Sequence, residues 1–263
     1  MHKLILIKLG GSLITDKSKP FTEKSLVIKR LAGEICQTKQ RSKKLLIIGH
    51  GGGSFPHVPA LKFKTNEGVI GKSSFRGIAE VQDAAARLNR IIVRAFLQKG
   101  ENAISFSPSS FMIASNGQIE DSFLCPLLRT LDFGMLPIVY GDVGLDLEMG
   151  CSILSTETIL NHLATRLKDK FKVEKVIYAG ITAGVYNRKG QTISAILPGQ
   201  FSRLKRCFGA SAGIDVTGGM LHKVETALKL AKSGIKTLIV NGKVPGNLKR
   251  AILGQEVKGT IIN

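Results

Sequence analysis

Six short apolar runs recur along the chain, and most are followed by a longer segment of mixed polarity. The runs are Leu4–Leu9, Leu45–Ile48, Ala103–Phe106, Leu136–Tyr140, Lys175–Tyr178 and Thr237–Val240. Continuous apolar runs of about four to eight residues are typical of strands that are buried on both faces. Their alternation with helix-length segments predicts an α/β fold with a mainly parallel sheet.

Two of the intervening segments have helical periodicity. Apolar side chains recur at spacings of three or four from Ile78 to Ala95, with arginine and glutamine between them. A similar pattern covers Lys223–Lys232. A stripe of this kind indicates a helix with one buried face. We therefore expect both helices to pack on the sheet.

Two short polar segments have the composition of β-hairpins. Ser115–Ile119 is centred on Asn116-Gly117, and Tyr186–Ile193 carries Lys189-Gly190 at its tip. Glycine after a polar residue favours the tight turns that connect two antiparallel strands. Both segments are expected to protrude as hairpins.

The chain is long enough for one large domain. Its 263 residues are 43% hydrophobic, which is sufficient for a full core. No apolar stretch approaches the roughly 20 residues of a membrane span, and the first apolar run is too short for a signal peptide. The four cysteines are widely spaced, which argues against zinc and against a disulfide framework. These features predict a cytoplasmic protein with reduced thiols and no membrane association.

The charge of the chain is strongly positive. The net charge is +19, with only 6% aromatic residues and no tryptophan. Clustered lysine and arginine would indicate nucleic-acid binding through counterion release. Here the basic residues are dispersed, and the runs at 39–44 and 203–206 are short. The pattern favours a basic surface around an anionic small molecule, without nucleic acid as a partner.

Two glycine-rich turns are the most informative features of the sequence. Lys8-Leu9-Gly10-Gly11-Ser12 ends the first apolar run, and a segment from Gly49 to His57 that contains three consecutive glycines follows the second. Glycine allows backbone N–H groups to approach an anion closely, and a helix that begins there adds its dipole. Both turns lie at the carboxyl ends of predicted strands, where open α/β sheets bind ligands. Neither turn matches a Walker or dinucleotide fingerprint, so together they predict a different kind of phosphoryl-transfer site.

Five segments, in this order along nearly the whole chain, carry a family resemblance. They are residues 8–17, residues 50–57, Pro108–Phe111, Tyr140–Val143 and the stretch from Asp215 to Lys223 with sequence Asp-Val-Thr-Gly-Gly-Met-x-x-Lys. The chain resembles the amino acid kinase family and, within it, the branch that phosphorylates isopentenyl phosphate. The triple-glycine loop that ends in histidine distinguishes this branch from the other members. The resemblance implies an open αβα sandwich over residues 1–263, ATP and Mg²⁺ as cofactors, and a homodimer.

The resemblance also implies roles for individual residues. With a soft boundary near Ala164–Val173, the part up to about residue 165 would bind the phosphate acceptor, and about 166–263 would bind ATP. The implied catalytic residues are Lys8, Lys17, His57 and Lys223. Those implied to bind ATP are Lys8, Gly10, Gly11, Ser12, Gly53, Ala179, Gly184, Gly219 and Lys223. Those implied to bind the acceptor are Gly52, Gly53, His57, Thr156 and Ile78, and no protein cage for a metal is expected.

Elementary chemistry agrees with these roles. Transfer to an acceptor that is already an ionised phosphate needs positive charge and positioning, and it needs no general base. His50 is expected to order the glycine loop. Asp142, at a strand end, is expected either to orient the lysines of the site or to serve as a structural cap at that strand end. The prenyl tail requires apolar walls, for which the Ile78–Leu88 helix, Phe111, Ile153 and Leu154 are candidates, and the small residues Gly77 and Ala84–Ala86 would leave room for longer alkyl chains.

Three segments depart from the family pattern. The segment 179–186 lacks two aspartates that relatives carry, Ser155-Thr156-Glu157-Thr158 replaces Ser-Gly-Asp-Asp, and Pro56 replaces a glycine. The departures keep two alternatives open. One is a kinase of the same fold for another small phosphate or phosphonate such as fosfomycin, and the other is a catalytically impaired nucleotide-binding regulator or a basic nucleic-acid-binding protein.

Overall fold

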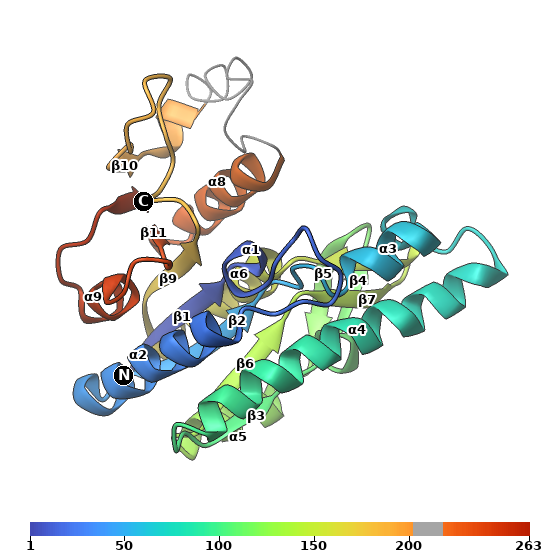
Figure 1. Ribbon diagram of the computed structural model, residues 1–263, viewed down its shortest axis with the longest axis horizontal. Helices are drawn as coiled ribbons and strands as arrows, with labels where there is room; N and C mark the ends of the chain where they lie inside the picture. The colour runs from blue at the N-terminus through green and yellow to red at the C-terminus, as the bar shows by residue number, and fades with distance from the viewer. Residues whose placement is uncertain (202–217) are drawn as a thin grey trace.

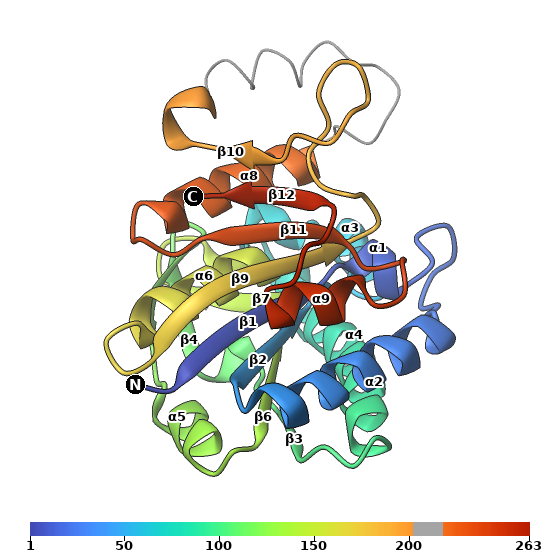
Figure 2. The same cartoon turned by 90° about the vertical axis from the view of Figure 1, so that its left-hand side faces the viewer.

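The computed structural model of the protein describes residues 1–201 and 218–263. Eight strands form one sheet in the order β10-β12-β11-β9-β1-β2-β6-β3, which can be followed from top to bottom in Figure 2. They are β1 (Lys3–Leu9), β2 (Leu45–His50), β3 (Ala103–Ser105), β6 (Leu136–Tyr140), β9 (Lys172–Gly180), β10 (Ala195–Ile196), β11 (Thr237–Asn241) and β12 (Gly259–Ile262). The six predicted strands are all present and pair in parallel, while β12 runs antiparallel to β11.

Helices cover both faces of this sheet (Figure 1). They are α1 (Gly11–Ile14), α2 (Ser25–Ser42), α3 (His57–Phe63), α4 (Lys72–Leu97), α5 (Cys125–Asp132), α6 (Thr156–Leu167), α8 (Gly218–Ala231) and α9 (Asn247–Leu253), with short 3-10 turns at Thr65–Glu67, Pro108–Ser110 and Pro198–Gln200. The predicted helix over Ile78–Ala95 lies within α4, and the one at Lys223–Lys232 lies largely within α8, which begins five residues earlier.

Strand β1 shows why the layers form. Successive side chains of a strand point to opposite faces. Leu4 and Leu6 pack with α5, α6 and α8, whereas Ile5 and Ile7 pack with α2, α4 and α9. All four are fully buried. The two cores on either side of a mainly parallel sheet confirm the predicted αβα sandwich.

A second sheet of four strands was not predicted. It has the order β5-β4-β7-β8 and contains β4 (Met112–Ser115), β5 (Gln118–Ser122), β7 (Asp142–Asp146) and β8 (Gly150–Leu154). The hairpin predicted around Asn116-Gly117 is its β4–β5 turn. Asp146 joins this turn to the β7–β8 turn, because its carboxylate accepts hydrogen bonds from backbone N–H groups of both turns.

The second predicted hairpin is only partly formed. Tyr186 and Thr192 make one antiparallel bridge, and residues around it adopt turns without paired strands. Asn187 holds this turn, since its side-chain oxygen accepts hydrogen bonds from the N–H groups of Lys189 and Gln191. The predicted boundary at Ala164–Val173 covers the end of α6 and the start of β9, and the strands before and after it belong to one continuous sheet.

Candidate functional site

A cavity of about 550 Å³ lies at the carboxyl ends of the central strands. It is lined from the β1–α1 turn, the loop after β2, α3, the β8–α6 junction, the end of β9 and the start of α8. The lining brings together the predicted residues Lys8, Gly10, Gly11, Ser12, Lys17, Gly52, Gly53, His57, Thr156, Gly219 and Lys223. Segments more than 200 residues apart in sequence therefore converge here, as expected for an open α/β sheet, which binds ligands at the carboxyl ends of its strands.

The first glycine turn is anchored to the neighbouring strand. The N–H of Gly10 donates to the carbonyl of Ala179 at 2.8 Å, which fixes the end of β1 against β9. Gly11 and Ser12 then begin α1 at the edge of the cavity. The first N–H groups of a helix have no partners within the helix, so they are available to an anion.

The two glycine turns touch through their backbones. A methyl group on Gly11 would lie 2.6 Å from the nitrogen of Gly53, and one on Gly51 would lie 2.8 Å from the nitrogen of Gly11. Gly53 has a φ of +56°, a conformation that side chains disfavour. Thr15 fixes this contact, because its hydroxyl accepts from the N–H of Ser54 and donates to the carbonyl of Gly11.

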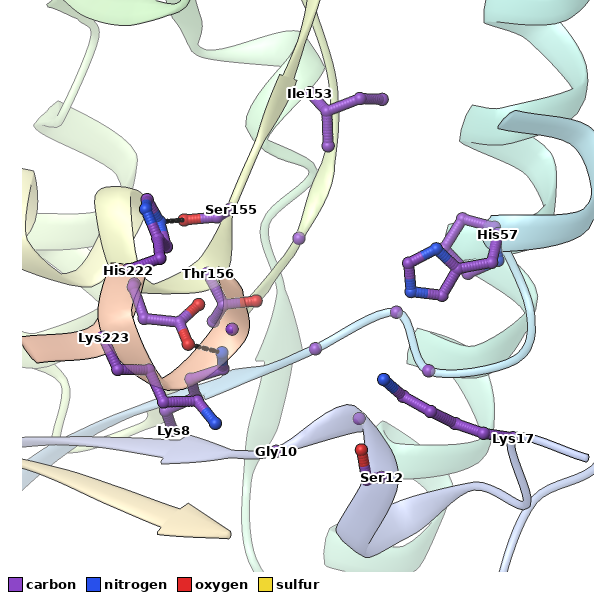
Figure 3. Close-up of a pocket in the computed structure, with 18 of the residues that line it drawn as sticks. Lys8, Gly10, Ser12, Lys17, His57, Ile153, Ser155, Thr156, His222 and Lys223 are labelled. Carbon is purple, nitrogen blue, oxygen red and sulfur yellow. Dashed lines mark hydrogen bonds and ion pairs between the residues drawn. The ribbon is translucent and has the colours of Figure 1, made fainter. Parts of the chain in front are cut away.

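Lys8 and Glu157 form a buried ion pair in the wall of the cavity (Figure 3). Their side chains are only 9% and 7% exposed. Burial alone would raise the pKa of Glu157, but the charge and hydrogen bond of Lys8 hold that pKa below its ordinary value. The glutamate that departs from the family pattern therefore stays ionised and orients Lys8.

Helix α8 places a second lysine on the same side. Lys223 lies in its first turns and adds to the positive field at Glu157. The preceding residue, His222, also lines the cavity and contacts the hydroxyl of Ser155 at 3.3 Å. Ser155 is the N-cap of α6, since its oxygen accepts from the N–H of Thr158. His222 and Ser155 were not predicted as site residues: both lie in segments quoted for the family pattern, but the resemblance implies no role for either of them.

Lys17 and His57 face the cavity from the opposite side (Figure 3). His57 begins α3 immediately after Pro56, the residue that departs from the family pattern. Burial, followed by the nearby charge of Lys17, lowers the pKa of His57. In the absence of an anion the imidazole is thus biased toward its neutral form.

His50 lies beneath the second glycine turn and is fully buried. Ser105 donates to the side-chain oxygen of Asn89, and the Asn89 amide donates to Nε2 of His50 at 3.1 Å. This assigns the ring proton to Nδ1, which donates to the carbonyl of Gly51 at 3.2 Å. The hydroxyl of Thr156 donates to the carbonyl of His50. The structure agrees with the predicted role of His50 in ordering the loop.

The burial of His50 predicts a stability change with pH. Burial lowers its pKa from 6.5 to about 4, so protonation favours the unfolded chain. The contribution of neutral His50 to the free energy of unfolding is fully present above pH 6.5. As pH falls from 6.5 to about 4, this contribution decreases by roughly 3 kcal/mol. When the free energy of unfolding, measured by urea unfolding, is plotted against pH from 4 to 7, its decrease at low pH should be smaller for His50→Gln than for wild type. The variant His2→Gln, at an exposed position, should show the wild-type pH dependence, and the same pH dependence in all three proteins would contradict the prediction.

The far end of the cavity is apolar. It is lined by Pro56, Ala60, Leu61, Val81, Ile153 and Leu154. The expected walls Ile153 and Leu154 are present. Phe111 instead packs on Phe106, and both rings are partly buried against the core.

The predicted wall helix Ile78–Leu88 does border the cavity, but through Val81 and not through Ile78. Val81 lines the cavity, whereas Ile78 packs beside Val81 against Val143 and Cys151 and is not part of the lining. The expectation of free space at Gly77 was wrong, because Phe63 fills the position that a side chain there would take. Val81 is therefore the residue that α4 contributes to the cavity wall.

Two residues expected to bind ATP lie outside the lining. Ala179 contributes its carbonyl to Gly10, and Gly184 packs against Thr260 with a φ of +123°. Neighbouring positions Gly180, Ile181 and Thr182 line the cavity in their place. The segment Asp215–Thr217 of the last motif and Cys207 lie outside the described residues.

Asp142 lines the cavity as a buried carboxyl group. Burial raises its pKa to about 6, although hydrogen bonds from Ser109, Val143 and Ser107 oppose the shift. These bonds support a capping role for the side chain. Within residues 1–201 and 218–263 no group of three histidine, cysteine, aspartate or glutamate residues could hold a metal ion.

The sequence profile of the amino acid kinase family matches residues 3–241. The chain belongs to the amino acid kinase family. It is 35% identical to isopentenyl phosphate kinase of Methanothermobacter thermautotrophicus, with 98% of each chain covered, and 32% identical to that of Methanocaldococcus jannaschii, with 99% of this chain and 98% of the relative covered. A solved isopentenyl phosphate kinase structure superposes with a TM-score of 0.83 at 33% identity, covering 99% of this chain and 100% of the other.

Among the described residues, no helix has the length and apolar character required to cross a membrane.

Proposed function

We propose that this protein transfers the γ-phosphoryl group of ATP to isopentenyl phosphate and so forms isopentenyl diphosphate. The observation that carries the proposal is one cavity with a cationic end at Lys8, Lys17 and Lys223 and an apolar end at Val81 and Ile153. Such a cavity suits an acceptor with an ionised phosphate and a short branched hydrocarbon tail. The similarity to isopentenyl phosphate kinases over nearly the full chain supports the same acceptor.

The proposed reaction needs little covalent chemistry from the protein. An oxygen of the acceptor phosphate attacks the γ-phosphorus, and the bond from that phosphorus to the β-phosphate oxygen breaks to release ADP. Charge spreads over the oxygens of the transferred group, so positive groups aimed at them lower the barrier. Lys8 is held for this task by Glu157, and Lys17 approaches from the opposite wall.

His57 is proposed to hold the acceptor phosphate. Its ring faces the cavity beside Lys17. Its pKa is lowered in the free protein, and a bound dianion would raise that pKa and so favour the protonated imidazole. The backbone N–H groups of Gly52 and Gly53 are proposed to assist. Thr156 supports these glycines indirectly, because its hydroxyl donates to the carbonyl of His50, the residue just before the glycine turn.

ATP is proposed to lie along the first glycine turn and the start of α8. The N–H groups of Gly10, Gly11 and Ser12 would meet the phosphates, with Gly219 and Lys223 on the other side. Mg²⁺ would arrive on ATP, where it neutralises phosphate charge. This arrangement fits the donors present, because Glu157 is paired with Lys8 and Asp142 is held by serine and backbone donors.

The assembly and location of the protein belong to the same proposal. A homodimer is supported by exposed apolar side chains on α3, α4 and the β7–β8 hairpin, among them Val58, Phe75 and Leu147. A cytoplasmic location is supported by Cys36 and Cys151, which are buried free thiols.

The test is ADP release by the purified protein with Mg²⁺ and ATP. The acceptors are isopentenyl phosphate, dimethylallyl phosphate, fosfomycin, acetylglutamate and UMP, each at several concentrations. We expect turnover with the two prenyl phosphates and little with the others. Turnover confined to fosfomycin or another acceptor would overturn the proposed substrate, and no turnover with any acceptor would overturn the proposed activity.

A further inference from the structure

The loop between α1 and α2 carries Lys17 to the cavity and is closed at its base. The N–H of Asp16 donates to the carbonyl of Thr22 at 2.8 Å, and Thr15 bridges Glu23 just outside that bond. The Asp16 carboxylate then accepts from the N–H and the hydroxyl of Ser18. Lys17 is therefore fixed with respect to its own loop, and its place in the cavity depends on what holds the loop.

Phe21 ties this loop to the second glycine turn. Its ring meets the ring of Phe55 edge to face, with centroids 5.8 Å apart and planes at 85°. Its N–H donates to the carbonyl of Ser54, and the N–H of Thr22 donates to the Ser54 hydroxyl. Phe55 is buried and lies two residues before His57. Phe21 thus connects the segment that carries Lys17 with the segment that carries His57.

The backbone of Phe21 adopts a conformation that its side chain disfavours. Its φ is +49°, a left-handed value that is uncommon for a bulky residue and is retained only where the surroundings enforce it. Glycine would adopt this conformation without steric cost. The phenylalanine therefore indicates that the ring itself is needed at this position.

Arg87 covers the ring from helix α4. Its guanidinium carbon lies 4.8 Å from the ring centroid, and its Nε contacts the Asp83 carboxylate at 3.1 Å. A guanidinium over an aromatic face is attracted by the ring quadrupole. The ring is consequently held by Phe55 of the glycine turn and by Arg87 of a rigid helix.

We propose that Phe21 is a positioning residue that sets the placement of Lys17 relative to His57, with Arg87 as its clamp. Phe21 lies outside the cavity lining, so it acts through Lys17 and does not contact the substrate. The inference rests on the proposed function for the role of Lys17. It identifies a hydrophobic contact, remote from the reacting atoms, as part of the machinery for phosphoryl transfer.

A double-mutant cycle with Lys17 tests the proposal. Phe21→Ala should lower kcat by about 10- to 100-fold in the wild-type background, since small misplacements of a catalytic group have effects of this size. In the Lys17→Ala background the same change should alter kcat by no more than about twofold, because the group that it positions is gone. An equal loss in both backgrounds would overturn the proposal, as expected of a residue that only stabilises the fold.

Two further variants separate the ring from the backbone. Phe21→Tyr keeps the edge-to-face contact and should retain nearly wild-type kcat, whereas Phe21→Gly suits the backbone and should lose as much activity as Phe21→Ala. A fully active Phe21→Gly would overturn the role of the ring. Thermal unfolding of each variant reports whether the fold is intact, and Phe21→Tyr keeps the test valid if Phe21→Ala unfolds.

Limited proteolysis with trypsin tests the contact of Phe21 with Phe55 and Arg87 in the absence of substrate. Cleavage after Lys17 should be faster in Phe21→Ala and in Arg87→Gln than in wild type or Phe21→Tyr, because the loop opens more often once the clamp is lost. Unchanged cleavage in both variants would overturn the proposed contact. A wild-type protein without activity on isopentenyl phosphate would instead contradict the proposed function, and the trypsin result would still decide how Phe21 holds the loop.

Discussion

Replacement of Lys8 by methionine should lower kcat at least 100-fold, the largest loss expected for a single side chain in this site. Methionine keeps the length of the side chain but removes the charge that faces the transferred phosphoryl group, and loss of one such donor has effects of about 10²–10³. The variant should also unfold more easily by about 3–5 kcal/mol, since Glu157 would remain buried without its partner. Steady-state ADP release and urea unfolding measure the two effects.

A second substitution separates catalysis from stability at this position. Lys8→Met combined with Glu157→Gln removes both charges, so stability should recover while kcat stays low. Lys3→Met is a matched control, because Lys3 lies at the other end of β1 and its exposed side chain pairs with Glu174. Recovery of kcat in the double variant would show that Lys8 acts only as the partner of Glu157.

His57→Ala should lower kcat/KM for isopentenyl phosphate about 100-fold, with KM for ATP nearly unchanged. A hydrogen bond to a charged group that is lost in a desolvated site has an effect of this order. The matched control is His162→Ala, whose ring is bonded to Ser122 outside the cavity and whose pKa is also lowered by burial. A similar loss in both variants would contradict a specific role for His57.

The pH dependence of acceptor binding provides a second measurement on His57. Burial and Lys17 lower its pKa in the free protein, and a bound dianionic phosphate raises it. Binding therefore takes up a proton, and acceptor affinity should fall as pH rises through the pKa of His57 in the complex. This dependence should be absent in His57→Ala. A variant that retains the full dependence would place the titrating group elsewhere.

The central strands and the glycine turns could be predicted because their signals are local. Leu4–Leu9 and Leu45–Ile48 are apolar on both faces, as expected of buried parallel strands, and the glycines follow directly. Since parallel strands end at one edge, the convergence of Lys8 and His57 on one cavity followed from topology. The second sheet gave no such signal, because β7 and β8 mix polar residues and glycine with their apolar residues, and β7 pairs with a hairpin that is distant in sequence.

The contacts that complete the site are long-range and could not be predicted. Lys8 and Glu157 are far apart in sequence, and they meet where Thr156 docks the start of α6 on the carbonyl of His50. Ile78 and Val81 lie one turn apart on the same face of α4, so periodicity identifies the buried face but not which turn of the helix borders the cavity. Spacing along the chain carries no information on either arrangement.

The contact between the two glycine turns has a consequence for how this sequence can change over evolutionary time. A side chain on Gly11 would collide with the backbone at Gly53, and one on Gly51 would collide with Gly11. A single substitution that adds a side chain at Gly11 or Gly51 would therefore disrupt the contact, so we expect both positions to remain glycine together. Variation in acceptor preference among descendants of this chain is accordingly expected at Val81, Leu61 and Ile153, whose side chains can change size without disturbing the turns.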